Sequence, residues 1–186
     1  MRTRRFSRPV RPRKVFLVLC EGETEKAYIE LLKRYYHLPI VIKTKVSGAG
    51  INERLVKQYV KEISIDKTDI CRVFYVYDCD VEAVRDKIVK LDGTAILSNP
   101  CIELWFMLHA NDHRSNVSSN TIVKHLQSSH PVWHSYCKGR ITSEQACHLL
   151  SHCAEAAKRA AKLAWPGNPS SNMSVFIDAL ETDKNS

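Results

Sequence analysis

The chain has 186 residues, 44% of them hydrophobic, which is enough for one domain with a substantial buried core. Its 28 basic and 20 acidic residues give a formal net charge of +8. This surplus indicates a polyanionic partner, most simply nucleic acid, although a basic protein without such a partner has the same composition. No apolar run approaches the roughly 18 residues of a membrane span, and the basic N-terminus lacks the apolar core of a signal peptide. We therefore expect no membrane segment and no secretion.

Seven cysteines are scattered singly along the chain, without a CxxC pair. Four of them lie in or beside apolar segments: Cys20, Cys71, Cys79 and Cys101. An odd number of isolated cysteines in such positions is typical of buried thiols in a reducing compartment, and it argues against a disulfide framework. We therefore expect a cytoplasmic protein.

The first 14 residues are strongly basic and contain no acid. Pro9 and Pro12 discourage a helix, so residues 1–14 are predicted to form a flexible basic arm. Such an arm can bind phosphates without reading sequence, and a solvated tail with no specific role is the alternative. The candidate nucleic-acid-binding residues are Arg2, Arg4, Arg5, Arg8, Arg11, Arg13 and Lys14.

The stretch 15–25 joins an apolar run to a group of carboxylates. Residues 15–19 carry no polar side chain and no alternation, which predicts a central parallel strand covered on both faces. Glu21 and Gly22 form a turn, and a helix is expected over residues 23–36. Glu21 then lies at the carboxyl end of a strand, where open α/β sheets bind ligands, and Glu25 lies one helical turn further on.

The alternation of strand and helix continues to residue 110. Further strands are expected at 38–46, 71–77 and 94–97, and further helices at about 52–63, 81–90 and 101–110. This order predicts an α/β fold with a mainly parallel four-stranded sheet over residues 15–110, in which 38–46 lies nearer an edge. The small loop Ser47–Gly50 could bind phosphate, but an ordinary strand-to-helix turn is the better interpretation.

After residue 110 the sequence indicates helices only, at about 120–128, 142–163 and 172–180, with residues 165–169 as a loop. We interpret residues 111–186 as a helical extension packed on the α/β core. Trp105 and Trp165 are expected in the core rather than as platforms for stacked bases.

Acidic residues follow the predicted strands at their carboxyl ends. Glu21 follows the first, Asp78 and Asp80 follow the third, and Ser98-Asn99 after the fourth leads to Glu103. These ends share one edge of a parallel sheet, and clustered carboxylates repel one another unless a cation neutralises them. Oxygen ligands without paired His or Cys favour Mg²⁺ or Mn²⁺, and two such ions could support phosphodiester hydrolysis. The alternatives are a helix cap after the third strand and a structural partner for Glu103.

Glu21-Gly22 followed by Asp78-Cys79-Asp80 resembles the Toprim pattern of one Glu after the first strand and a DxD after a later one. Three further segments are similar to the RloB family: Cys20-Glu-Gly-Glu-Thr-Glu25, Ser98-Asn-Pro-Cys-Ile-Glu-Leu-Trp-Phe-Met-Leu-His109, and Asn168-Pro-Ser170. This resemblance covers nearly the whole chain from Lys14 onward.

The resemblance implies a small Toprim protein encoded near bacterial restriction-modification and abortive-infection loci, with a separate ATPase as partner. By likeness to OLD-type nucleases it implies metal-dependent cleavage of phosphodiester bonds, with DNA favoured over RNA. Glu21, Glu25, Asp78 and Asp80 would be the metal ligands, and Glu21, Asp78, Asp80 and Glu103 the catalytic residues. No motif places a catalytic Lys. A non-catalytic nucleic-acid- or partner-binding subunit and a phosphohydrolase of nucleotides or RNA are the alternatives, and the sequence leaves the oligomeric state open.

Several histidines lie outside these motifs. His109 ends the apolar helix and is expected to bond a backbone carbonyl rather than to donate a proton in catalysis. His148 and His152 are four residues apart on one predicted helix, but with Cys137, Cys147 and Cys153 they match no strong zinc pattern. We therefore do not predict a zinc site.

Overall fold

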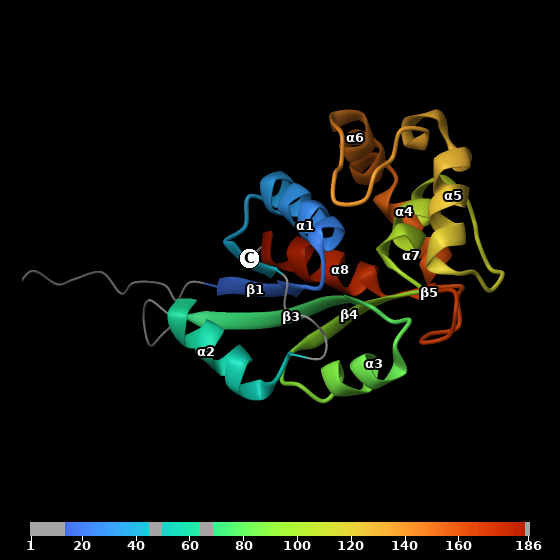
Figure 1. The fold of residues 1–186 in the computed structure, drawn as a ribbon. Coiled ribbons are helices and arrows are strands. Elements are labelled where there is room, and N and C mark those ends of the chain that lie inside the picture. The colour runs from blue at the N-terminus through green and yellow to red at the C-terminus, as the bar shows by residue number, and fades with distance from the viewer. Residues whose placement is uncertain (1–13, 45–49, 64–68, 185–186) are drawn as a thin grey trace, which may run out of the picture.

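The computed structural model describes residues 14–44, 50–63 and 69–184, and it forms an α/β fold around one sheet (Figure 1). The sheet has five strands in the order β2-β1-β3-β4-β5. The first four are parallel, and β5 is antiparallel to β4. The strands are β1 (Lys14–Cys20), β2 (Ile40–Thr44), β3 (Ile70–Asp78), β4 (Thr94–Asn99) and β5 (Ser170–Ser171).

Helices cover both faces of this sheet. Successive strand residues point to opposite faces, and each face therefore has its own apolar cluster. Phe16 and Val18 of β1 belong to one cluster, and Leu17 and Leu19 belong to the other. Figure 1 shows α1 and α8 on one face, α2 and α3 on the other, and α4 to α7 grouped at the carboxyl ends of the strands. The helices are α1 (Glu23–Tyr36), α2 (Glu53–Ile63), α3 (Glu82–Ile88), α4 (Ile102–Ala110), α5 (Ser119–Ser129), the short 3₁₀ helix η1 (Pro131–Trp133), α6 (Ser143–Ser151), α7 (Cys153–Ala160) and α8 (Met173–Lys184).

The predicted α/β order is confirmed over residues 15–110, and β2 lies at an edge of the sheet as expected. The predicted count of four strands is wrong, because Ser170 and Ser171 add a fifth strand beside Asn99 and Ser98. A two-residue serine strand carries no apolar signal. The helix expected over 142–163 is two helices, which meet at His152.

The C-terminal segment is integral to the sheet and its helical layer. Phe176 of α8 packs edge-on against Phe74 of β3, with ring centroids 4.9 Å apart. Asp183, near the end of α8, forms ion pairs with Lys14 at 3.0 Å and with Arg72 at 3.2 Å. The assignment of Lys14 to a flexible arm is therefore corrected: it is the first residue of β1 and is tied to α8.

Some predicted features lie outside the described residues. These are the arm residues Arg2, Arg4, Arg5, Arg8, Arg11 and Arg13 and most of the Ser47–Gly50 loop. Among the residues that are described, no helix has both the length and the apolar character needed to cross a membrane.

Asn172 joins the start of α8 to the middle of β4. Its Oδ1 accepts the backbone N–H of Leu97 at 2.7 Å, and its Nδ2 donates to the carbonyl of Ala95 at 2.9 Å. Asn172→Ala leaves both backbone groups without these partners, so we expect a loss of about 2–4 kcal/mol in the free energy of unfolding. Thermal denaturation should show a fall of roughly 5–15 °C in Tm. Asn120→Ala, at an exposed position of α5, is the matched control and should leave Tm within about 2 °C.

Candidate active site

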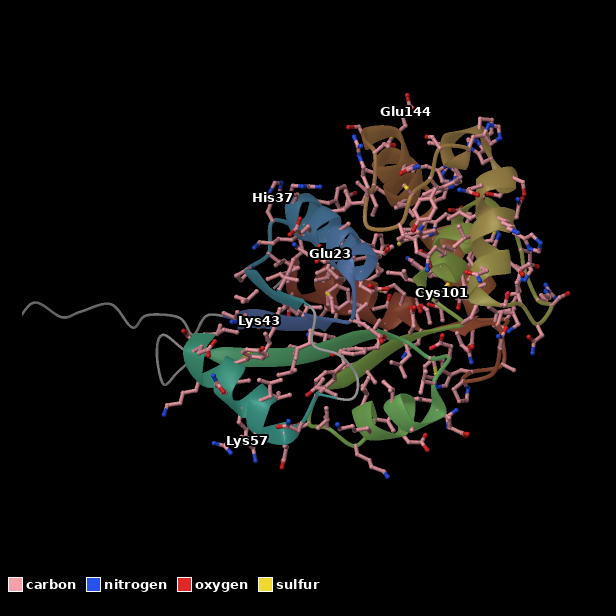
Figure 2. The ribbon with its side chains drawn as sticks, in the orientation of Figure 1. Glu23, His37, Lys43, Lys57, Cys101 and Glu144 are labelled. Atoms are coloured by element: carbon pink, nitrogen blue, oxygen red, sulfur yellow. The ribbon has the colours of Figure 1, made fainter. Side chains whose placement is uncertain are left out.

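A pocket of about 380 Å³ opens where β1 and β3 end, and most of the predicted carboxylates line it. The register explains this convergence, since Cys20 of β1 pairs with Val76 of β3, and Asp78 of β3 pairs with Ser98 of β4. Glu23 and Cys101, labelled in Figure 2, mark the starts of the helices α1 and α4 that add to the pocket. The lining residues are Glu21, Gly22, Glu23, Thr24, Glu25, Asp78, Glu103, Lys138 and Gly139.

Glu21 reaches the pocket from the turn that follows β1, and Glu25 reaches it from the first turn of α1. Glu21 Oε2 accepts the backbone N–H of Asp78 at 3.1 Å, which links the ends of β1 and β3. Glu25 is only 5% exposed, and its carboxylate folds back over Gly22. A Cβ at Gly22 would lie 2.8 Å from Glu25 Oε2, so a larger residue at this turn would displace the Glu25 carboxylate. Burial raises the pKa of both carboxyls, although backbone N–H groups partly oppose that rise.

Asp78 is the carboxylate that its surroundings perturb most clearly. Its Oδ1 accepts the backbone N–H of Ile102 at 3.1 Å, at the start of α4. Burial, followed by the charges of Glu25, Glu103 and Glu21, raises the pKa of Asp78 to about 9. Without a cation, the pocket therefore favours a protonated Asp78 at neutral pH.

Glu103 is 1% exposed and is held by a loop that the sequence did not connect to the site. Tyr136 donates its hydroxyl to Glu103 Oε1 at 2.8 Å, and Lys138 Nζ lies 3.6 Å from the same oxygen. The N–H of Gly139 donates to Thr24 Oγ1 at 2.8 Å, which ties this loop to α1 as well. Burial alone would lower the pKa of Lys138, but Glu103 and the other nearby acids raise it, so Lys138 stays charged.

Lys138 and Tyr136 are the site residues that sequence reasoning missed. They lie more than 30 residues beyond Glu103, in a short segment without a motif, and only tertiary packing brings them to the pocket. Tyr136 is positioned by its edge-on contacts with Phe106 and Trp133, whose ring centroids lie 6.2 and 5.7 Å from its own. No local pattern in the sequence signals these contacts.

Asp80 is exposed and is absent from the residues that line the pocket. It is still close enough to Glu21 for its charge to contribute to the raised pKa of that carboxyl. The structure therefore brings Glu21, Glu25, Asp78 and Glu103 together and leaves Asp80 at the rim.

The carboxylate oxygens of the pocket suit a hard cation, but their arrangement does not form a complete coordination site. Within the described part of the chain, no three His, Cys, Asp or Glu side chains stand together in a way that could hold an ion. Glu103 Oε2 is nevertheless buried without a hydrogen-bond partner, and Asp78 lies among three other acids. A divalent cation would relieve both conditions, because carboxylate oxygens are preferred ligands of Mg²⁺ and Mn²⁺. Binding would require some of these side chains to turn.

His109 makes the expected hydrogen bond with a backbone carbonyl. His109 Nδ1 bonds the carbonyl of Trp105 at 2.8 Å, and the ring is buried away from the carboxylates that line the pocket. His130, His148 and His152 stack in sequence, with ring centroids 4.8 and 4.4 Å apart. These rings are tilted against one another, and within the described residues they are not a group of three side chains that could hold a metal ion.

The two tryptophans predicted to lie in the core differ in the structure. Trp105 is fully buried, and its Nε1 donates to Tyr28 at 2.8 Å. Trp165 is 44% exposed, so its assignment to the core is wrong. It follows α7 in the Pro- and Gly-containing loop that leads to β5, where no further helical turn covers it.

Comparison with protein-family models gives a match to the family described as RloB-like protein, over residues 16–180. This chain belongs to the RloB-like family. The part of the chain that the family model matches includes every residue that lines the pocket. Comparisons with curated proteins and with solved structures give no match. The predicted resemblance to the RloB family is confirmed, while the wider Toprim resemblance stays a prediction.

The burial of His109 makes a prediction about acid stability. Burial lowers the pKa of His109 from 6.5 to about 3, with His148, His152 and Arg159 adding to the fall. A histidine with a lowered folded-state pKa contributes stability that is complete above pH 6.5 and is lost as the pH falls toward 3. The wild-type free energy of unfolding should therefore fall over this range with a slope of up to about 1.4 kcal/mol per pH unit from His109.

His109→Gln should reduce that slope by close to this amount in urea denaturation series measured at several pH values. His134→Gln, at an exposed position, is the matched control and should follow the wild type. Parallel pH profiles for wild type and His109→Gln would contradict the prediction.

Proposed function

We propose that the RloB-like chain is a metal-dependent nuclease that cleaves phosphodiester bonds in nucleic acid at the carboxylate pocket. The observation that carries this proposal is the convergence of Glu21, Glu25 and Glu103, from the segments after β1 and β4, around the half-buried Asp78. The net charge of +8 supports it, because a basic protein attracts a polyanion while an acidic pocket repels one unless a cation is bound.

Glu21, Glu25 and Asp78 would hold Mg²⁺ or Mn²⁺, and Asp80 would join them from the rim. When bound, such ions supply Lewis-acid polarisation of a phosphate oxygen and lower the pKa of water. Glu103, held in place by Tyr136, is in position to orient an attacking water. Lys138 would add a positive charge 3.6 Å from Glu103 Oε1, where it could pair with a phosphate oxygen as charge builds up in the transition state.

Family membership supports an association with restriction-modification loci. We extend the proposal to DNA as the substrate, a separate ATPase as partner and a role in anti-phage defence, on the basis of the resemblance to OLD-type nucleases. The basic net charge also fits one alternative, a chain that binds nucleic acid or a partner without cleaving it.

Cleavage should depend on Asp78. In a supercoiled-plasmid nicking assay with Mg²⁺ or Mn²⁺, Asp78→Asn should lower the rate by at least about 100-fold, because a lost metal ligand removes several kcal/mol of transition-state stabilisation. Asp86→Asn changes an exposed acid on α3 that pairs with Arg85, and it should nick at the wild-type rate. Equal rates for Asp78→Asn and wild type would contradict the proposed site.

Metal binding can be measured without turnover. Mg²⁺ should raise the Tm of the wild type, since a ligand that binds only the folded state stabilises it, and the rise should shrink in Asp78→Asn. A metal-dependent rise in Tm without nicking of any plasmid would support the non-catalytic alternative. Turnover only on nucleotides or RNA ends would support a phosphohydrolase.

Substitution of Lys138 should lower the rate of nicking more than it weakens the binding of metal. Lys138→Met removes the charge beside Glu103, and the nicking rate should fall by roughly 10–100-fold while the Mg²⁺-dependent rise in Tm is kept. Lys138→Arg should retain part of the rate. Lys124→Met, an exposed lysine of α5, is the control and should have no effect. Loss of the metal-dependent rise in Lys138→Met would instead assign Lys138 a structural role.

A further inference from the structure

Trp165 is an exposed aromatic side chain in a loop whose backbone is held in place. The other two tryptophans, Trp105 and Trp133, are fully buried, whereas Trp165 is 44% exposed. Asn168 fixes the loop by accepting the N–H of Val117 at 3.1 Å and donating to its carbonyl at 2.9 Å. Asn99 adds a bond from its Nδ2 to the carbonyl of Pro166 at 3.1 Å. The indole is therefore presented to solvent from an ordered position.

Two exposed lysines lie in the segment that leads to Trp165. The helical winding of α7 continues to Leu163 through backbone bonds, which places Lys158 and Lys162 at i and i+4 on one face, and Trp165 follows two residues after this winding ends. Both lysines are exposed. Arg114, Lys162 and Arg159 all lower the pKa of Asp112, which places three basic groups near that carboxyl.

This surface lies at the same edge of the sheet as the carboxylate pocket. Asn99, which holds Pro166, directly follows Ser98, and Ser98 is the register partner of Asp78. Figure 1 shows the loop between α7 and β5 at the end of the sheet where β3 and β4 finish. One strand of nucleic acid could therefore contact both the indole and the pocket.

We propose that Trp165, with Lys158 and Lys162, forms a stacking platform for an unpaired base of a nucleic-acid strand that leads to the carboxylate pocket. An exposed aromatic ring near lysine side chains can bind a single strand, because every base offers a π-face and the lysines can pair with the phosphates. A base within a duplex is stacked on its neighbours and does not present that face. This inference rests on the proposed function for the identity of the partner, and it narrows the substrate to nucleic acid with unpaired nucleotides.

Binding of a fluorescein-labelled oligothymidylate of about 16 nucleotides, in EDTA to prevent cleavage, tests the platform. Trp165→Ala should weaken binding by roughly 5–150-fold, the range measured for losing one aromatic–base stack, and Trp165→Phe should restore most of it. Lys158→Gln and Lys162→Gln should each reduce the slope of log affinity against log salt by about 0.7, whereas Lys124→Gln should not. Affinity for a blunt duplex of the same sequence should be unchanged by Trp165→Ala.

Tryptophan fluorescence provides a direct signature of stacking. The oligothymidylate should quench the emission of the wild type, since Trp165 is the exposed indole, and this quenching should be absent in Trp165→Phe. Unchanged oligothymidylate affinity in Trp165→Ala, or an equal loss for single strand and duplex, would overturn the proposal. Unchanged affinity together with lost self-association in size-exclusion chromatography would assign Trp165 to a protein contact instead.

The two proposals can fail separately. Trp165-dependent binding in a chain that nicks no plasmid with any divalent metal would refute the nuclease and leave the platform standing. Metal-dependent nicking with no effect of Trp165→Ala on single-strand binding would refute the platform alone.

Discussion

Mutual repulsion among clustered, partly buried acids is the constraint on which the site depends. Asp78 lies between Glu21, Glu25 and Glu103, and the fold holds these groups with backbone N–H donors and one tyrosine hydroxyl. Burial alone makes the ionised forms costly, and proximity adds to that cost. A protein rarely retains such an arrangement for stability, because an apolar pocket of the same size would be more favourable. The arrangement is therefore an argument for function, and a cation is the simplest species that reconciles it with neutral pH.

The helical segments after residue 110 complete this site instead of merely covering the sheet. The loop between η1 and α6 brings Tyr136 and Lys138 to Glu103, and it bonds Thr24 of α1 through the N–H of Gly139. Gly139 has a φ of +78°, a conformation that favours glycine, and a Cβ there would lie 3.3 Å from the Cβ of Glu23. The α/β sheet thus supplies the acids, and the C-terminal half of the chain supplies the compensating charge.

The sequence predicted the parallel part of the fold well, because each buried strand is a continuous apolar run that ends in polar residues. The same logic placed Glu21, Asp78 and Glu103 at one edge, since parallel strands share a carboxyl end. It could not find Lys138 or Tyr136, whose approach depends on the packing of Phe106 against Trp133 and Tyr136. It also missed β5, where two serines pair with β4 without any apolar pattern, and it misplaced Trp165, because an aromatic residue in a loop gives no sign of its exposure.

The ion pair between Lys14 and Asp183 has a consequence for protein engineering. It holds the first residue of β1 beside the end of α8, at the opposite end of β1 from the pocket. Because the pair lies away from the acids, charge at this end of the sheet can be changed by substitution without altering the groups that line the pocket.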